Sequence, residues 1–129
     1  TQQPRAQAVV TPDTILRAQQ MVDEIYVDRK IKQYILDIVF ATREPQQNGM
    51  DDLVPLIQMA ASPRATLALL KASKAHAFLQ QRSYVTPNDV KAIAYDVLCH
   101  RLGITFEAEA QDVTQNDIVN EILRRTAVP

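Results

Sequence analysis

The stretch Ala60-Ala61-Ser62-Pro63-Arg64-Ala65-Thr66-Leu67-Ala68-Leu69-Leu70-Lys71 starts a helix that is apolar or small on almost every side. Ser62 is a favoured N-cap residue, because its hydroxyl can accept a hydrogen bond from a backbone N–H of the first turn. Pro63 suits the first helical position, where its missing N–H costs nothing. Because a helix of this kind is typically the centre of a helical domain, we expect helix 62–81 to be the central element. Its apolar residues are Leu67, Leu70, Ala77 and Phe78 on one side, and Ala65, Ala68, Ala72 and Ala75 over much of the rest.

Arg64 occupies the first turn of this helix, where a cation opposes the helix dipole by roughly 0.3–1 kcal/mol. Residues 53–88 contain no acid, but they do contain Arg64, Lys71, Lys74 and Arg82. At helical spacing the first three form a basic ridge along one edge. An arginine beside free backbone N–H groups, without an internal counter-ion, is half of an anion site. The alternative interpretation is that the ridge is only a solvent-facing helix edge.

The composition indicates one helical domain. The chain has 129 residues, 2 Gly, no Trp and few aromatic residues, which favours an all-α fold over a sheet sandwich. A net charge of −1 gives no general attraction to nucleic acid or an anionic membrane. No apolar run is long enough for a membrane span, and no leader is recognisable. The single Cys99 fits a reducing, cytoplasmic setting, and the absence of an initial Met suggests a fragment of a longer protein.

Cap signals and apolar spacing predict a compact bundle of about five helices. Residues 1–10 are expected to be a linker or entry segment, and residues 11–129 the helical domain. Pro45 and the polar run after it predict an exposed loop over 44–52, whereas residues 53–61 fit either a packed turn or a helix interrupted by a proline. The alternation of 104–109 predicts a short strand or extended segment. The helices are expected to begin near Thr11, after Asp28, and at Ser62, Thr86 and Thr114.

The chain lacks several kinds of chemistry. It has no glycine-rich phosphate loop, so it cannot hydrolyse a nucleotide by itself. His76 and His100 have no Cys or carboxylate partner at ligand spacing, and we expect no metal site. Cys99 and His100 would point about 100° apart on a helix, which is wrong for a nucleophile and its base.

The segments Ser62-Pro63-Arg64-Ala65 and Tyr84-Val85-Thr86-Pro87-Asn88-Asp89-Val90, with the Ala/Leu-rich helix between them, resemble the C-terminal lid domain of MoxR-type AAA+ ATPases. Thr42-Arg43 and His100-Arg101-Leu102 also match that family, so the resemblance covers nearly the whole chain. It implies a lid that packs over a nucleotide held by a preceding large α/β domain. The P-loop, the metal-binding acid and the arginine finger would then lie outside this chain.

On this resemblance Arg64 is the sensor-2 arginine, which contacts the γ-phosphate and acts in hydrolysis. Ser62 and Lys71 are further candidate residues for binding ATP, with Mg²⁺ held mainly by the large domain. The family usually has glycine where Ala60 and Gln81 stand. The resemblance also implies ring hexamers, contacts between neighbouring subunits, chaperone-like remodelling and partners with von Willebrand factor A domains.

Two other classes of function stay open. Residues 84–90 are also similar to the turn before the last helix of histone-like folds, but the near-neutral charge counts against nucleic-acid binding. The stronger alternative is a helical protein-interaction module without a nucleotide role. Neither a nucleic-acid nor a membrane partner is expected.

Overall fold

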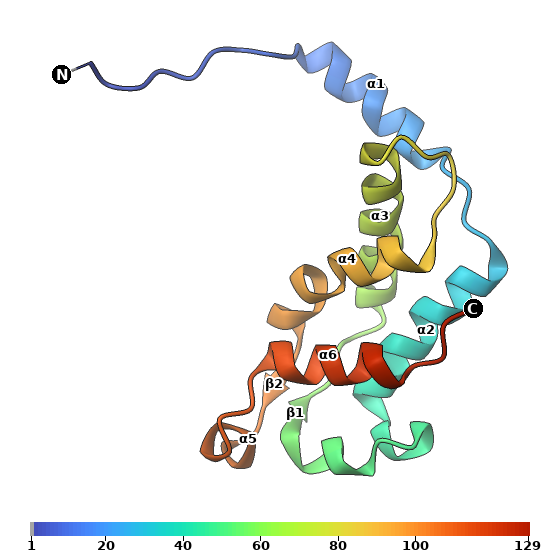
Figure 1. Cartoon of the computed structure of the whole chain (residues 1–129), viewed down its shortest axis with the longest axis vertical. Helices are drawn as coiled ribbons and strands as arrows, with labels where there is room; N and C mark the ends of the chain where they lie inside the picture. Colours follow the sequence, from blue (N-terminus) through green and yellow to red (C-terminus); the bar gives the residue numbers. More distant parts are fainter. Residues whose placement is uncertain (1) are drawn as a thin grey trace.

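The computed structural model describes residues 2–129, which form six α-helices and one apolar core (Figure 1). The predicted all-α class is confirmed. The α-helices are α1 (Pro12–Asp23), α2 (Arg29–Arg43), α3 (Arg64–Leu79), α4 (Pro87–Leu98), α5 (Phe106–Ala110) and α6 (Gln115–Arg125). Between them lie the 3-10 helices η1 (Pro45–Asn48), η2 (Asp51–Leu56) and η3 (Cys99–Arg101). The strands β1 (Ile57–Met59) and β2 (Gly103–Ile104) pair antiparallel.

Four helix starts lie where the sequence predicts them, because each is fixed by a side-chain cap. Thr11 Oγ1 accepts a hydrogen bond from the backbone N–H of Thr14, and Asp28 caps α2 in the same way. Thr86 and Thr114 form capping boxes at the starts of α4 and α6. Each cap satisfies N–H groups that the first helical turn leaves unpaired.

Helix α3 is the central element, as predicted, and packs against α1, α2 and α4. Its buried stripe is formed by Ala65, Leu69, Ser73 and Ala77, which repeat every four positions. On the apolar side expected from the sequence, Leu67 is 61% exposed, whereas Leu70 and Phe78 are partly buried against the core. Leu69 is the one large residue of the buried stripe, and the small Ala65, Ser73 and Ala77 allow close approach of the neighbouring backbones.

Two connecting segments differ from their predictions. The predicted exposed loop over 44–52 instead forms 3-10 turns that bury Pro45 and Met50, whose backbone N–H donates to Pro45 O. The strand near 104 is short, because Thr105 Oγ1 accepts from the N–H of Ala108 and caps α5 over most of the predicted strand. The undecided segment 53–61 is the end of η2 followed by β1.

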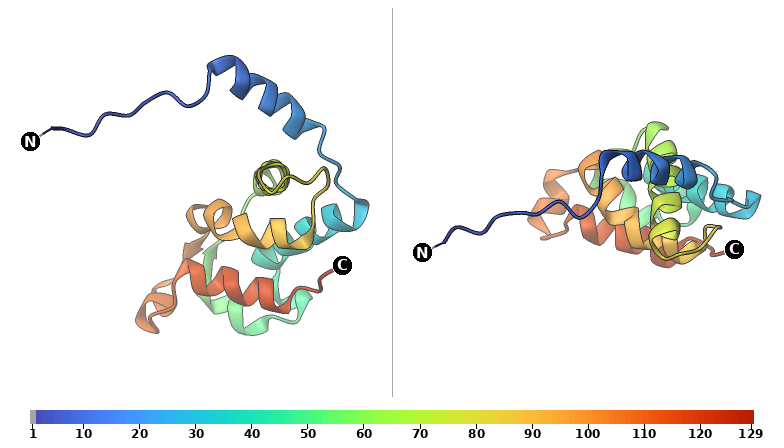
Figure 2. Two further views of the ribbon diagram at one scale, coloured as in Figure 1. Left: turned by 45° about the horizontal axis from the view of Figure 1, so that its top comes forward. Right: turned by 90° about the horizontal axis from the view of Figure 1, so that it is seen from above.

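Helix α1 lies at one end of the domain beside α3 and buries none of its own residues (Figure 2). Residues 2–10 precede it, exposed and without helix or strand. Its end is fixed by Lys74 Nζ, which donates to Asp23 O at 3.3 Å, and by Tyr26, which bridges to Tyr84. No helix in the described part of the chain is both long and apolar enough to cross a membrane.

Candidate functional site

The start of α3 is built without the predicted Ser62 cap. Pro63 already has helical dihedral angles (φ −56°, ψ −24°), and no side chain caps the helix. The first turn is instead closed by backbone bonds from Ala65 N–H to Ser62 O at 2.9 Å and from Thr66 N–H to Pro63 O at 3.1 Å. The prediction was wrong because the chain before the helix is fixed from outside, by side chains of α2.

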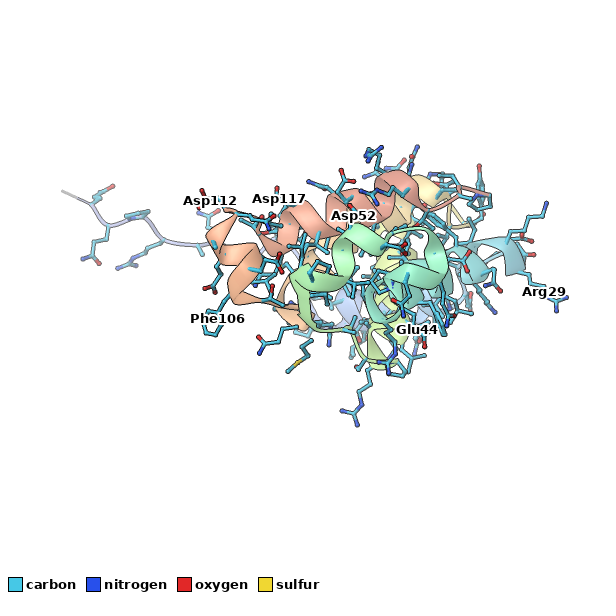
Figure 3. The ribbon with its side chains drawn as sticks, turned by 90° about the horizontal axis from the view of Figure 1, so that it is seen from below. Arg29, Glu44, Asp52, Phe106, Asp112 and Asp117 are labelled. Carbon is cyan, nitrogen blue, oxygen red and sulfur yellow. The ribbon has the colours of Figure 1, made fainter. Side chains whose placement is uncertain are left out.

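The side chains that fix it belong to Thr42 and Arg43, the last residues of α2. Thr42 Oγ1 accepts a hydrogen bond from Ala61 N–H at 3.2 Å, and Arg43 Nη1 donates to Ala61 O at 3.1 Å. Ala61 is fully buried, so both of its polar backbone groups need such partners. We call these two bonds the Ala61 clamp; Glu44, labelled in Figure 3, directly follows its arginine.

Arg64 stands exposed in the first turn, between the fully buried Ala61 and Ala65. Within residues 2–129 its guanidinium makes no hydrogen bond and no ion pair. Its backbone is therefore fixed while its side chain is free. A free guanidinium beside an uncapped helix N-terminus can bind an anion presented from outside the domain.

The predicted basic ridge does not form one site. Lys71 is exposed, but it lies seven positions after Arg64, about 10.5 Å along the helix axis. Lys71 and Lys74 border a shallow apolar groove between α1 and α3, and Lys74 is used to cap α1. Ser62 is exposed in the same turn as Arg64, so these two share a location while Lys71 lies apart.

Arg82 and His76 have a carboxylate partner that sequence spacing missed. Arg82 binds Asp89 in bidentate fashion at 2.5 and 2.6 Å, and His76 Nδ1 lies 2.7 Å from Asp89 Oδ1. Burial of Asp89 acts to raise its pKa, but the hydrogen bonds from Arg82, Thr86 and His76 outweigh burial and hold the pKa well below the usual range. Arg82 is therefore no part of a free anion site. The described residues contain no group of three possible metal ligands.

Comparisons with known proteins agree with this architecture. The sequence profile of the AAA lid domain family matches residues 54–122. The chain is 35% identical over 126 residues to the chaperone MoxR1 of Mycobacterium tuberculosis and 34% identical over 121 residues to the uncharacterised protein YeaC of Bacillus subtilis. These alignments cover 98% and 94% of this chain but 33% and 35% of those proteins.

A solved structure shares the fold as well. It is a crystal structure from Cytophaga hutchinsonii, described provisionally as an ATPase, with a TM-score of 0.87 and 34% identity; the match covers 91% of this chain and 36% of that one.

The chain belongs to the AAA lid domain family. The resemblance to the lid of MoxR-type AAA+ ATPases is confirmed. This chain spans about a third of the length of the curated relatives it matches.

Proposed function

We propose that this chain is the nucleotide-sensing lid of a MoxR-type AAA+ ATPase, with Arg64 as its sensor-2 arginine. The observation that carries the proposal is the combination of a free, exposed guanidinium with a rigidly held backbone at an uncapped helix start. Ser62 lies in the same turn and contributes its hydroxyl. Lys71 is the more distant third candidate, on the same side of α3.

The proposed role of Arg64 includes hydrolysis as well as contact with the bound nucleotide. Arg64 presents planar donors that match phosphate oxygens, and phosphoryl transfer depends mainly on positioning and on stabilising developing charge. The Ala61 clamp and the buried Ala65 let the domain move with Arg64 as one body. Contact between Arg64 and the γ-phosphate would thus draw the whole lid towards the domain that holds ATP and Mg²⁺.

The partners follow from the same family relationship. They are a preceding AAA+ large domain and neighbouring subunits of a cytoplasmic ring, which we propose to be a hexamer with chaperone-like remodelling activity. We also propose a partner protein with a von Willebrand factor A domain, which would bring the protein to be remodelled to the ATPase. The net charge of −1 supports the absence of nucleic acid from this list.

The test is Arg64→Ala in the intact ATPase that contains this domain. We expect ATP turnover to fall by about 100-fold, as for loss of one donor to a transition-state charge, while nucleotide binding persists. Arg29→Ala is the matched control, because Arg29 is also exposed but lies at the start of α2, away from α3 (Figure 3). Unchanged turnover in Arg64→Ala would refute the sensor role.

The second candidate function is a helical protein-interaction module without a nucleotide role. The observation that favours it is the apolar surface of α1, where Ile15, Leu16 and Met21 are each about half exposed or more. This alternative predicts that Arg64→Ala leaves turnover unchanged and that an α1 variant, Leu16→Asp, abolishes partner capture.

A further inference from the structure

The Ala61 clamp has a fixed geometry. The Thr42 hydroxyl donates its proton to Val39 O at 2.7 Å, so only its lone pairs face the N–H of Ala61. Thr42 is 1% exposed, and its β-branched side chain is stiff within a helix. Ala61 is fully buried as well, so its N–H depends on this hydroxyl for a hydrogen bond. The direction of the chain after β1 is therefore imposed by the end of α2.

The clamp acts on the segment that leads directly into Arg64. Ala61 lies three residues before Arg64, and Ala65, which follows it, is completely buried with its N–H bonded to Ser62 O. Helix α3 has no side-chain cap of its own. The clamp bonds no N–H of the first turn, but it fixes the chain three residues before Arg64 and so determines where the first turn of α3 stands.

We infer that Thr42 and Arg43 are positioning residues for Arg64, which hold the start of α3 so that its guanidinium reaches the terminal phosphate. This inference rests on the proposed function of Arg64. Arg43 holds Ala61 O from the exposed side and Thr42 holds Ala61 N–H from the buried side. Because a displacement of about 1 Å can cost up to about 100-fold in rate, loss of either bond is expected to act on turnover.

The main experiment compares Thr42→Val with Thr42→Ser in the intact ATPase. Valine keeps the shape of threonine but removes the hydroxyl, whereas serine keeps the hydroxyl. We expect Thr42→Val to lower kcat by about tenfold while the KM for ATP stays within about twofold, because the nucleotide is held mainly by the large domain. Thr42→Ser is expected to keep at least about half of the wild-type kcat, because it preserves the hydroxyl that positions Arg64.

Hydrogen exchange of the Ala61 amide in the same intact protein gives a readout independent of catalysis. The bond to Thr42 is what protects this N–H. We expect exchange to be at least about tenfold faster in Thr42→Val and unchanged in Thr42→Ser.

A second pair of variants is needed because substitution of the buried Thr42 could impair folding and lower kcat for that reason alone. Arg43→Met removes the bond to Ala61 O from an exposed side chain, and Arg29→Met makes the same change in the first turn of α2. We expect a lower kcat only for Arg43→Met.

The outcomes separate this inference from the proposed function. If Arg64→Ala loses turnover while Thr42→Val and Arg43→Met keep it, the positioning role is overturned and the sensor role stands. A serine variant as impaired as the valine variant also overturns it. If Arg64→Ala keeps wild-type turnover, the proposed function fails and the positioning role fails with it, whatever the exchange rate at Ala61.

Discussion

Gln81 has a left-handed backbone conformation (φ +61°), which residues other than glycine rarely adopt. It follows the end of α3, where Gln81 N–H donates to Phe78 O and Arg82 N–H donates to Ala77 O. These are the two bonds of a Schellman motif, in which glycine usually takes this position. A glycine would adopt this conformation without strain, which agrees with the glycine that the resemblance leads us to expect where Gln81 stands. At Ala60, the other departure, φ is not positive, and no glycine is required.

We expect Gln81→Gly to raise the free energy of unfolding by about 0.5–1 kcal/mol, because relief of the left-handed strain exceeds the added entropy of the unfolded chain. The neighbouring Gln80 is a matched control, since it has φ −86°. Gln80→Gly should lower the free energy of unfolding by about 0.5–1 kcal/mol. Urea unfolding of both variants measures the difference. Destabilisation by both substitutions would contradict the assignment of strain to Gln81.

At the scale of the element, α3 and α6 start in different ways. Helix α6 is capped locally, with Thr114 Oγ1 accepting from Asp117 N–H and Asp117 accepting from Thr114 N–H. Helix α3 depends on the clamp from α2 instead, and Ser62 caps nothing. The two helices therefore differ in which substitution weakens their first turn.

Thr114→Ala is expected to destabilise the domain by about 1 kcal/mol, because the cap bond is lost. Ser62→Ala should change the free energy of unfolding by less than about 0.5 kcal/mol, as for a surface substitution without partners. Thermal and urea unfolding compare the two variants directly. An equal loss in Ser62→Ala would show that its hydroxyl caps α3 in solution.

At the scale of the whole molecule, carboxylates join separate structural elements. Asp89 at the start of α4 binds Arg82 and His76, which precede it. Asp52 in η2, labelled in Figure 3, binds Arg125 at the end of α6 through two bonds of 2.6 and 2.7 Å. The bonds from Arg125 lower the pKa of Asp52, and the bonds from Arg124 and Arg125 lower that of Glu121.

These lowered pKa values make the domain sensitive to acid. A carboxyl group with a pKa lower in the folded state stabilises the fold above its unfolded pKa, about 3.9 for Asp and 4.3 for Glu, and loses this contribution as the pH falls further. We expect the free energy of unfolding to decrease steadily below about pH 4.5. Urea unfolding between pH 7 and 2.5 measures the decrease, and a flat profile would contradict it.

The variant Asp89→Asn tests whether Asp89 is the main contributor to this pH-dependent part of the free energy of unfolding. At pH 7 the variant should be less stable by about 3 kcal/mol, because Arg82 and His76 lose a buried partner. The difference from the wild type should narrow below about pH 4, since the unfolded chain then binds a proton at Asp89 that the folded state, with its lowered pKa, does not bind. A difference that is the same at pH 7 and 2.5 would contradict this role of the carboxylate.

The sequence alone determined the features that depend on neighbours within a few residues. Caps at Thr11, Asp28, Thr86 and Thr114 connect atoms three positions apart or fewer, so four helix starts could be predicted from their local signals. For the same reason, the sequence was enough to show that Arg64 is a cation in a first helical turn that contains no acid.

Only the tertiary structure decided which surfaces meet. Which face of α3 is buried, the carboxylate partner of Arg82, and the clamp that fixes the chain before α3 all depend on how whole helices pack. Thr42 and Ala61 are 19 residues apart, and His76 and Asp89 are 13 apart. No local propensity encodes such pairs, because they form only when burial of apolar surface brings their helices together.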